Sequence, residues 1–228
     1  MMKPPVLSFI ANVIHPTKQS MGCILFAVLV VVSSPYCFAD DVVDPAYLKV
    51  VTDRAAKIVD QLDISDADQS IRVRDIIALQ YVNLSQIHDQ RDQAIQAARA
   101  GDPTKEDVDA VVSAARNQAD AEIYKLHAAY LAQLSAELTP EQVDGVKDGM
   151  TYGVMENTYN VYMKMMPDLS AEQKRQIRAW LWEARELAMD QGSSKEKHGV
   201  FGKYKGKINN YVSAAGYNLK EAEKNLQR

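Results

Sequence analysis

Cysteine is nearly absent from this chain of 228 residues: its only two cysteines, Cys23 and Cys37, lie close to the N-terminus. Residues 40–228 therefore cannot form a disulfide, a thiolate metal site or a cysteine nucleophile. They also lack the GxSxG, HExxH, CxxC and phosphate-loop motifs that indicate a catalytic mechanism, and their three histidines stand in unrelated contexts. We therefore expect neither a metal site nor a cofactor.

Long hydrophobic runs are equally scarce. The longest, residues 22–32, is too short to cross a bilayer comfortably, and it follows two positive charges, Lys3 and Lys18. Small residues then lead to Ala39, which completes the pattern of a secretory signal peptide over residues 1–39. We expect cleavage after Ala39, leaving a single periplasmic or secreted domain without a membrane span. Retention of the leader as an anchor is the alternative.

Positive charge is in the minority. The chain has 26 lysine and arginine residues against 30 aspartate and glutamate residues, a formal net charge of −4, and loss of Lys3 and Lys18 with the leader would lower it to −6. This acidic balance disfavours the phosphate backbone of nucleic acids. We therefore expect no nucleic acid partner.

Strand patterns are scarce as well, whereas the signals that begin helices recur along the chain. Asp44 precedes Pro45, so the aspartate can cap a helix whose first position is the proline. Gly101 and Pro103 mark a tight turn between two long helical patterns, which should therefore pack antiparallel. The sequence predicts an all-α fold, a single-domain bundle of about six helices with a long antiparallel hairpin. The predicted helices cover residues 45–62, 66–99, 105–136, 140–166, 171–191 and 194–214.

Capping boxes are predicted at Thr139, Ser170 and Ser193, and the first two share one motif. Thr139 precedes Gln142 in LTPEQ, and Ser170 precedes Gln173 in LSAEQ, so each helix would begin with a hydroxyl cap and an amide three residues later. The motif resembles the LTxxQ signature of small periplasmic stress chaperones, which are α-helical proteins that shield unfolded clients. It is also what any well-capped helix behind a hydrophobic residue requires. A chaperone-like function is therefore kept as an alternative.

Polar residues interrupt the apolar face of the second predicted helix. Arg91 lies in the middle of that face, with His88 one turn before it. A buried guanidinium needs a carboxylate and further acceptors to offset the loss of water. The pair is therefore either a structural ion-pair cluster or one side of a ligand cavity.

Two later helices carry polar or aromatic residues that their core stripes do not explain. The predicted helix 140–166 is apolar on two faces, and one of them includes Asp148 and Tyr152. Trp182 points away from the apolar stripe of its own helix and shares that side with Glu186. An indole among charged groups is typical of a sugar-stacking platform, and also of a helix that contacts two neighbours.

The segment EKHGVFGKYKGKINNYV, residues 196–212, combines lysine, glycine, aromatic residues and asparagine. One face, with Phe201 and Ile208, has the spacing of a core stripe, and the lysines could simply form a solvated face. Its three glycines each cost about 1 kcal/mol relative to alanine in a helix, which indicates close approach by a neighbour or ligand. The adjacent Asn209 and Asn210 can both donate and accept, which suits a hydroxyl-rich ligand.

Three segments carry a family resemblance: IHDQRD, KDGMTYGV, and WLWEARELAMDQGSSKEKHGVFGKYKGKINNYVSAAGYNL. They resemble an exported bacterial family catalogued as a domain of unknown function, for which sugar binding has been suggested and which occurs in polysaccharide-degrading bacteria. The resemblance extends over residues 44–219. It implies a helical fold and a carbohydrate context, and it supplies no catalytic residue.

We therefore expect a carbohydrate-binding or carbohydrate-processing exported protein of polysaccharide utilisation, whose partner is an oligosaccharide or a polysaccharide fragment. Aromatic rings would stack on sugar rings, amides and carboxylates would bind hydroxyl groups, and cationic side chains would bind a carboxylate or sulfate of an acidic glycan. An enzyme acting on oligosaccharides, a lyase or a hydrolase, is the alternative, because acids and bases lie among the same residues. No catalytic residue is assigned. The candidate ligand-binding residues are His88, Arg91, Asp148, Tyr152, Trp182, Glu186, His198, Lys203, Tyr204, Lys205, Asn209 and Asn210.

Overall fold

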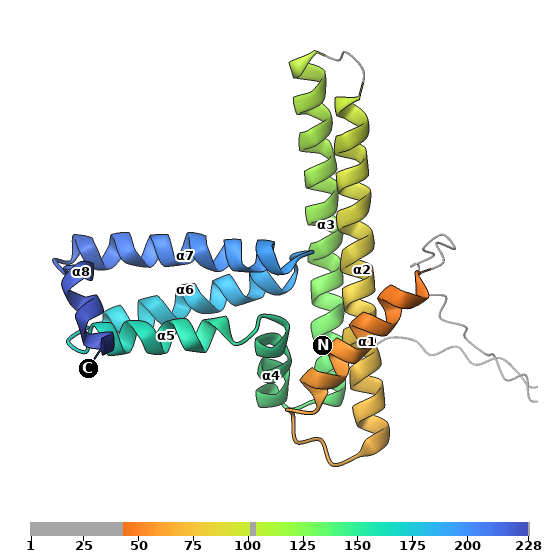
Figure 1. Cartoon of the computed structure of the whole chain (residues 1–228). Helices are drawn as coiled ribbons and strands as arrows, with labels where there is room; N and C mark the ends of the chain where they lie inside the picture. The colour runs from red at the N-terminus through yellow and green to blue at the C-terminus, as the bar shows by residue number, and fades with distance from the viewer. Residues whose placement is uncertain (1–42, 101–103, 228) are drawn as a thin grey trace, which may run out of the picture. The chain divides into compact units, whose positions relative to one another are not determined.

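The computed structural model describes residues 43–100 and 104–227, and every regular element in these ranges is a helix (Figure 1). The predicted all-α fold is therefore confirmed. The predicted leader, residues 1–39, and the turn at residues 101–103 lie outside the described residues. The elements are α1 (Pro45–Val59), α2 (Ala67–Arg99), α3 (Lys105–Glu137), α4 (Pro140–Met150), α5 (Val154–Met165), α6 (Ala171–Met189), α7 (Ser194–Ala214), α8 (Leu219–Ala222) and the 3-10 helix η1 (Glu223–Gln227).

Most helices begin at the caps that the sequence predicts. Asp44 caps α1 by accepting from the backbone N–H of Ala46, and the predicted capping boxes at Thr139 and Ser170 are complete. The third predicted box is only half formed, because Ser193 accepts from the backbone N–H of Glu196 without the reciprocal bond. The second helix is capped by Asp66, the first residue of the predicted range 66–99, which accepts from two backbone N–H groups. Local side chain to backbone bonds of this kind satisfy the free amides of the first turn, which is why short patterns locate helix starts well.

The prediction of one continuous helix over residues 140–166 is wrong. α4 ends at Met150 and α5 begins at Val154, because Tyr152 and Gly153 adopt left-handed backbone conformations with φ values of 60° and 63°. Two consecutive left-handed residues cannot continue a right-handed helix, and such a φ is costly for a non-glycine residue such as Tyr152. α4 and α5 therefore run in different directions (Figure 1).

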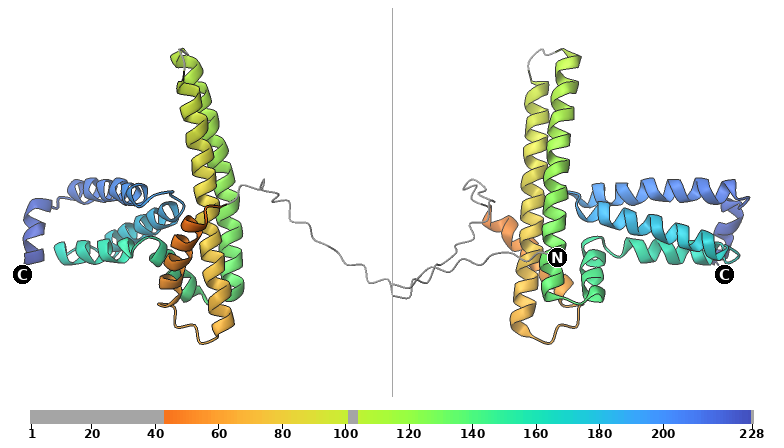
Figure 2. Two further views of the ribbon diagram at one scale, coloured as in Figure 1. Left: turned by 45° about the vertical axis from the view of Figure 1, so that its right-hand side comes forward. Right: turned by 180° about the vertical axis from the view of Figure 1, so that it is seen from behind.

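The helices pack around two separate hydrophobic cores. The first core is formed by α1, α2, α3 and α4, with Met189 from the end of α6, and the second by α5, α6 and α7. Figure 2 shows α2 and α3 side by side and antiparallel, which confirms the predicted long hairpin. None of the helices in residues 43–100 and 104–227 is long and apolar enough to span a membrane.

α4 lies unusually close to α1. A Cβ added to Gly149 would stand 2.9 Å from both Cγ1 and Cγ2 of Ile58, which is closer than packed side chains tolerate. At Gly149 a helix of the same chain therefore approaches the backbone closely. The close approach expected at Gly199, Gly202 and Gly206 of α7 is not made by a neighbouring part of the chain, because nothing in the described residues lies within 4 Å of a Cβ at these positions.

This contrast gives a matched pair of substitutions. Gly149→Ala should destabilise the fold by about 1 to 2 kcal/mol, because the new methyl group overpacks the contact with Ile58. Gly199→Ala should instead stabilise it, by up to about 1 kcal/mol, because alanine is the better helix former and meets open space. Urea denaturation followed by circular dichroism measures both. Equal effects of the two substitutions would contradict the α1–α4 contact.

Candidate functional site

The predicted site residues do not surround one cavity. They divide among a polar layer where the two cores meet, a small notch between α2 and α3, a groove beside α5 and α7, and exposed aromatic positions. We use the name polar layer for His88, Arg91, His127, Asp144, Lys147, Asp148, Arg185, Glu186, Asp190 and Lys197, which are joined by hydrogen bonds or ion pairs or lie beside them.

His88 is buried and held by partners on both ring nitrogens. Its Nε2 lies 2.8 Å from the backbone O of Asp190, and its Nδ1 lies 2.9 Å from a guanidinium nitrogen of Arg91. A carbonyl can only accept and an arginine can only donate, so these contacts assign Nε2 as the donor and Nδ1 as the acceptor. The side chain of Arg91 is also paired with Asp92 at 2.8 Å. Hydrogen bonding to Asp92 outweighs partial burial and raises the pKa of Arg91.

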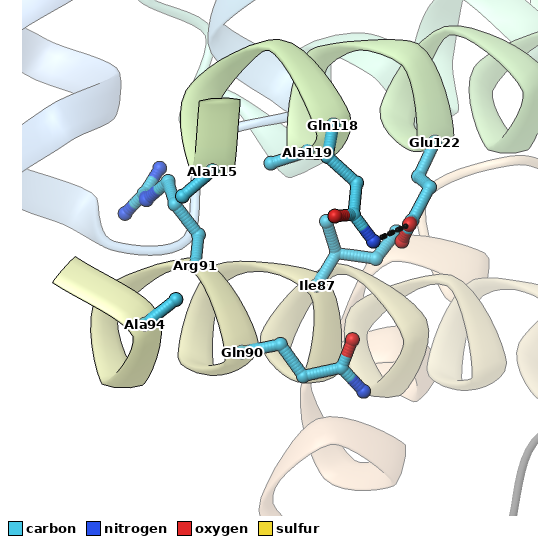
Figure 3. A pocket seen from close by; sticks show the side chains of 8 residues that line it. All are labelled: Ile87, Gln90, Arg91, Ala94, Ala115, Gln118, Ala119 and Glu122. Carbon is cyan, nitrogen blue, oxygen red and sulfur yellow. Dashed lines mark hydrogen bonds between the residues drawn. The ribbon is translucent and has the colours of Figure 1, made fainter. Parts of the chain in front are cut away.

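Arg91 also borders the notch between α2 and α3 (Figure 3). From α2 its side chain extends toward α3, where the Nε2 of Gln118 donates to Glu122 at 3.0 Å. The cavity volume is only about 60 Å³. That space suits a few water molecules rather than a sugar ring.

Arg185 is the centre of the charged contacts between α4 and α6. It is only 4 % exposed, and its guanidinium donates to Asp144 at 2.6 Å and to Asp148 at 3.0 Å. Burial opposes the charge, but the hydrogen bonds to Asp148 and Asp144 outweigh it and raise the pKa of Arg185. Glu186 is paired with Lys147 at 2.8 Å. The candidate carboxylates Asp148 and Glu186 are therefore both engaged with cations of the same chain.

Lys197 is a buried cation that sequence reasoning missed. It is 4 % exposed, and its Nζ donates to the carbonyl oxygens of Met150 and Met189, the last residues of α4 and α6. A cation at two helix C-termini complements both helix dipoles, yet burial lowers the pKa of Lys197 to about 8. The available signal was its position four residues before Phe201, on the core stripe of α7.

His127 was also missed, and it links α3 to the end of α6. Its Nδ1 lies 2.8 Å from Oδ2 of Asp190, and this hydrogen bond raises the pKa of His127. The other carboxyl oxygen of Asp190, Oδ1, is buried and has no hydrogen-bond partner among the described residues. His127 stands between apolar positions of α3 in the sequence, but nothing local indicates a partner 63 residues away.

The α5–α7 groove is a cavity of about 330 Å³ that includes two of the predicted residues, Lys205 and Asn209. The phenol of Tyr162 donates to Oδ1 of Asn209 at 2.6 Å and so orients the amide. Burial raises the pKa of Tyr162 to about 12, so this phenol remains a donor at neutral pH. The lining residues are Asn157, Thr158, Val161, Tyr162, Met165, Lys205, Asn209, Leu219 and Glu223.

The predicted aromatic platform at Trp182 is exposed but belongs to a contact between α5 and α6. The Trp182 side chain is 47 % exposed, and the guanidinium carbon of Arg178 lies 5.9 Å from its ring centre. The same guanidinium stacks on Tyr159 at 3.9 Å and pairs with Glu156 at 3.1 Å. The indole therefore has one side against a structural contact and the rest open to solvent.

The other candidates of α7 lie outside both cavities. His198 is exposed and stacks on Tyr152, with ring centres 5.7 Å apart and an angle of 18° between the planes. Burial and a hydrogen bond to Glu183 raise the pKa of Tyr204 to about 12. Lys203 and Asn210 are exposed. In the part of the chain that the structure describes, no group of histidine, aspartate and glutamate residues could hold a metal ion.

Fold and site together define an all-α protein with two hydrophobic cores, a polar layer between them, and a groove at the side of the second core. The chain belongs to the family described as Protein of unknown function (DUF3826), whose model matches residues 48–228. The expected membership of a family of unknown function is thereby confirmed, whereas the sugar-binding role stays a prediction. No curated protein matches this chain.

Proposed function

We propose that this chain is an exported protein that binds carbohydrate, and that the α5–α7 groove is its binding site. The observation that supports this proposal is the placement of Lys205 and Asn209. Both were selected from the sequence as ligand-binding candidates, and both line a groove that Asn157 and Thr158 of α5 also line. Amides and hydroxyl groups both donate and accept, as the hydroxyl groups of a sugar require.

The composition of the groove supports a sugar over a purely apolar ligand. Val161, Met165 and Leu219 supply an apolar surface for the CH groups of a sugar ring. Lys205 and Glu223 supply one charge of each sign. A cavity of about 330 Å³ lies at the lower end of the range for small-molecule sites, which favours one or two sugar units over a long segment of polysaccharide.

An oligosaccharide lyase or hydrolase has less support from the same geometry. Paired-carboxylate hydrolysis needs two carboxyl groups free to face the substrate. Asp148 is bound to Arg185 and Glu186 to Lys147, and neither of them lines the groove. We therefore propose binding rather than paired-carboxylate hydrolysis at the groove.

Two neighbouring asparagines provide the test. Asn209→Ala should weaken binding of a short oligosaccharide about tenfold or more, because it removes the amide that Tyr162 orients at the groove. Asn210→Ala is the matched control, since it changes the adjacent exposed residue, which does not line the groove, and it should leave affinity unchanged. Isothermal titration calorimetry with neutral and uronic acid oligosaccharides measures both. Absence of heat with every saccharide class, or equal losses in the two variants, would sink the proposal.

A further inference from the structure

α5 and α7 both run along α6 and point in the same direction (Figure 1). Two contacts set the register of one helix against the other. Near their starts, the ring of Tyr152 stacks on that of His198, with centres 5.7 Å apart. Further along both helices, the phenol of Tyr162 donates to Asn209 at 2.6 Å. The α5–α7 groove lies at the second contact, so the stacked rings stand beyond the end of the groove that is nearer to α4.

The stacked rings and the groove share one side of α7. His198 precedes Lys205 by two helical turns, and Asn209 follows Lys205 by one more turn, so the three side chains leave the helix on the same side. Gly202 stands between His198 and Lys205 on that side, and a Cβ added there would meet open space. No side chain of α7 therefore separates the rings from the groove at this position. The rise of an α-helix puts His198 about 16 Å from Asn209 along the axis.

The backbone of Tyr152 is costly for a tyrosine. Its φ is 60°, a left-handed value that glycine and asparagine adopt much more readily. Core packing does not compensate, because 48 % of Tyr152 is exposed, and its stacking partner His198 is exposed as well. Backbone strain that the surrounding structure maintains occurs preferentially at ligand sites. Neither the local backbone nor the core therefore accounts for an aromatic ring at this position.

We propose that the stacked rings of Tyr152 and His198 form a second subsite, on which an oligosaccharide bound in the α5–α7 groove continues, so that the protein selects a chain of several sugar units over a disaccharide. This inference rests on the proposed function, because it extends the same site. The groove holds one or two units, and the exposed surface of the rings packs against the CH groups of a unit further along the chain. Only a ligand that spans about 16 Å contacts both Asn209 and the rings.

The dependence of affinity on chain length tests the second subsite. A hexasaccharide should bind the wild-type protein about tenfold more tightly than the disaccharide of the same sugar. Tyr152→Asn removes the ring and keeps a residue that tolerates the left-handed backbone, so this variant should fold. It should lose most of the tenfold gain and leave the affinity for the disaccharide unchanged. His198→Ala removes the other ring at an exposed position and should lower only the affinity for the hexasaccharide, by about threefold.

A longer chain also offers the groove more registers, so the variants decide the outcome rather than the ratio in the wild type alone. Tyr124→Asn is the matched control, because Tyr124 is an exposed tyrosine of α3 that does not line the groove, and it should leave both affinities unchanged. Asn209→Ala should weaken both ligands alike, since both occupy the groove. NMR gives a readout without substitution: the ring signals of His198 should shift with the hexasaccharide and not with the disaccharide.

Isothermal titration calorimetry measures these affinities with cello-oligosaccharides and with oligogalacturonides, each as the disaccharide and the hexasaccharide. Absence of heat with both sugars at both lengths would overturn the proposed function and the second subsite together. Binding that depends on Asn209, but whose dependence on chain length is the same in the wild type, Tyr152→Asn and His198→Ala, would overturn the second subsite alone.

Discussion

Replacing Arg185 with methionine is expected to lower the free energy of unfolding by about 2 to 3 kcal/mol. Methionine retains most of the apolar stem, so the loss comes from the guanidinium and not from a large cavity. Asp144 and Asp148 of α4 would then stand at the contact with α6 without the cation that they share. Both carboxylates remain partly exposed to water, which keeps the effect below that of a fully buried broken ion pair.

Arg175→Met is the matched control for this substitution. Arg175 lies on the same helix and is exposed, so its replacement should change stability by less than about 0.5 kcal/mol. Urea denaturation of the three proteins at neutral pH measures the difference. If Arg185→Met were no more destabilising than Arg175→Met, the charged contact between α4 and α6 would have no energetic role.

Lys197 should make the protein more stable as the pH is raised from about 8 to 10. Burial lowers the pKa of Lys197 to about 8 in the folded protein, whereas an unfolded lysine keeps its proton to about pH 10.4. The unfolded state therefore holds the additional proton in this window, and linkage requires that stability increases with pH, here by about 2 kcal/mol. Lys197→Met removes the titrating group and should abolish most of this increase.

Tyr81 and Tyr162 limit the pH range over which the stability of the protein increases. Burial raises the pKa of Tyr81 and of Tyr162 to about 12, so above about pH 10 the folded state keeps phenol protons that the unfolded state loses. Their contribution therefore declines with pH and limits the gain from Lys197. Thermal unfolding of the wild type and of Lys197→Met at intervals from pH 7 to 10 measures the effect. Parallel curves for the two proteins would assign the pH dependence to other groups.

The helices and most of their starts could be predicted because the deciding interactions are local. Thr139 and Gln142 stand three residues apart and complete a capping box whatever packs around them. The break between α4 and α5 was missed because the apolar pattern continues across it. It depends on two left-handed residues, and a single tyrosine–glycine pair in a sequence does not reveal that conformation.

The candidate site, like the fold, could be predicted from the sequence only in part. Asn209 and Lys205 could be selected from one unusual segment of sequence, but only packing brought them to the same groove as Asn157 and Thr158. His88 and Arg91 were recognised as a polar interruption of an apolar face. The partner of His88 across the fold, Asp190, lies 102 residues away in the sequence, so no local pattern could identify it.

Residue order by itself determined the all-α class, the capped helix starts and the long hairpin, because caps and apolar periodicity act over a few residues. Tertiary structure alone decided that two hydrophobic cores form and that Arg185 and Lys197 lie buried between them. The physical reason is that the state of a charged side chain depends on the groups that surround it. Those groups come from helices far apart in the chain and meet only after the helices have packed.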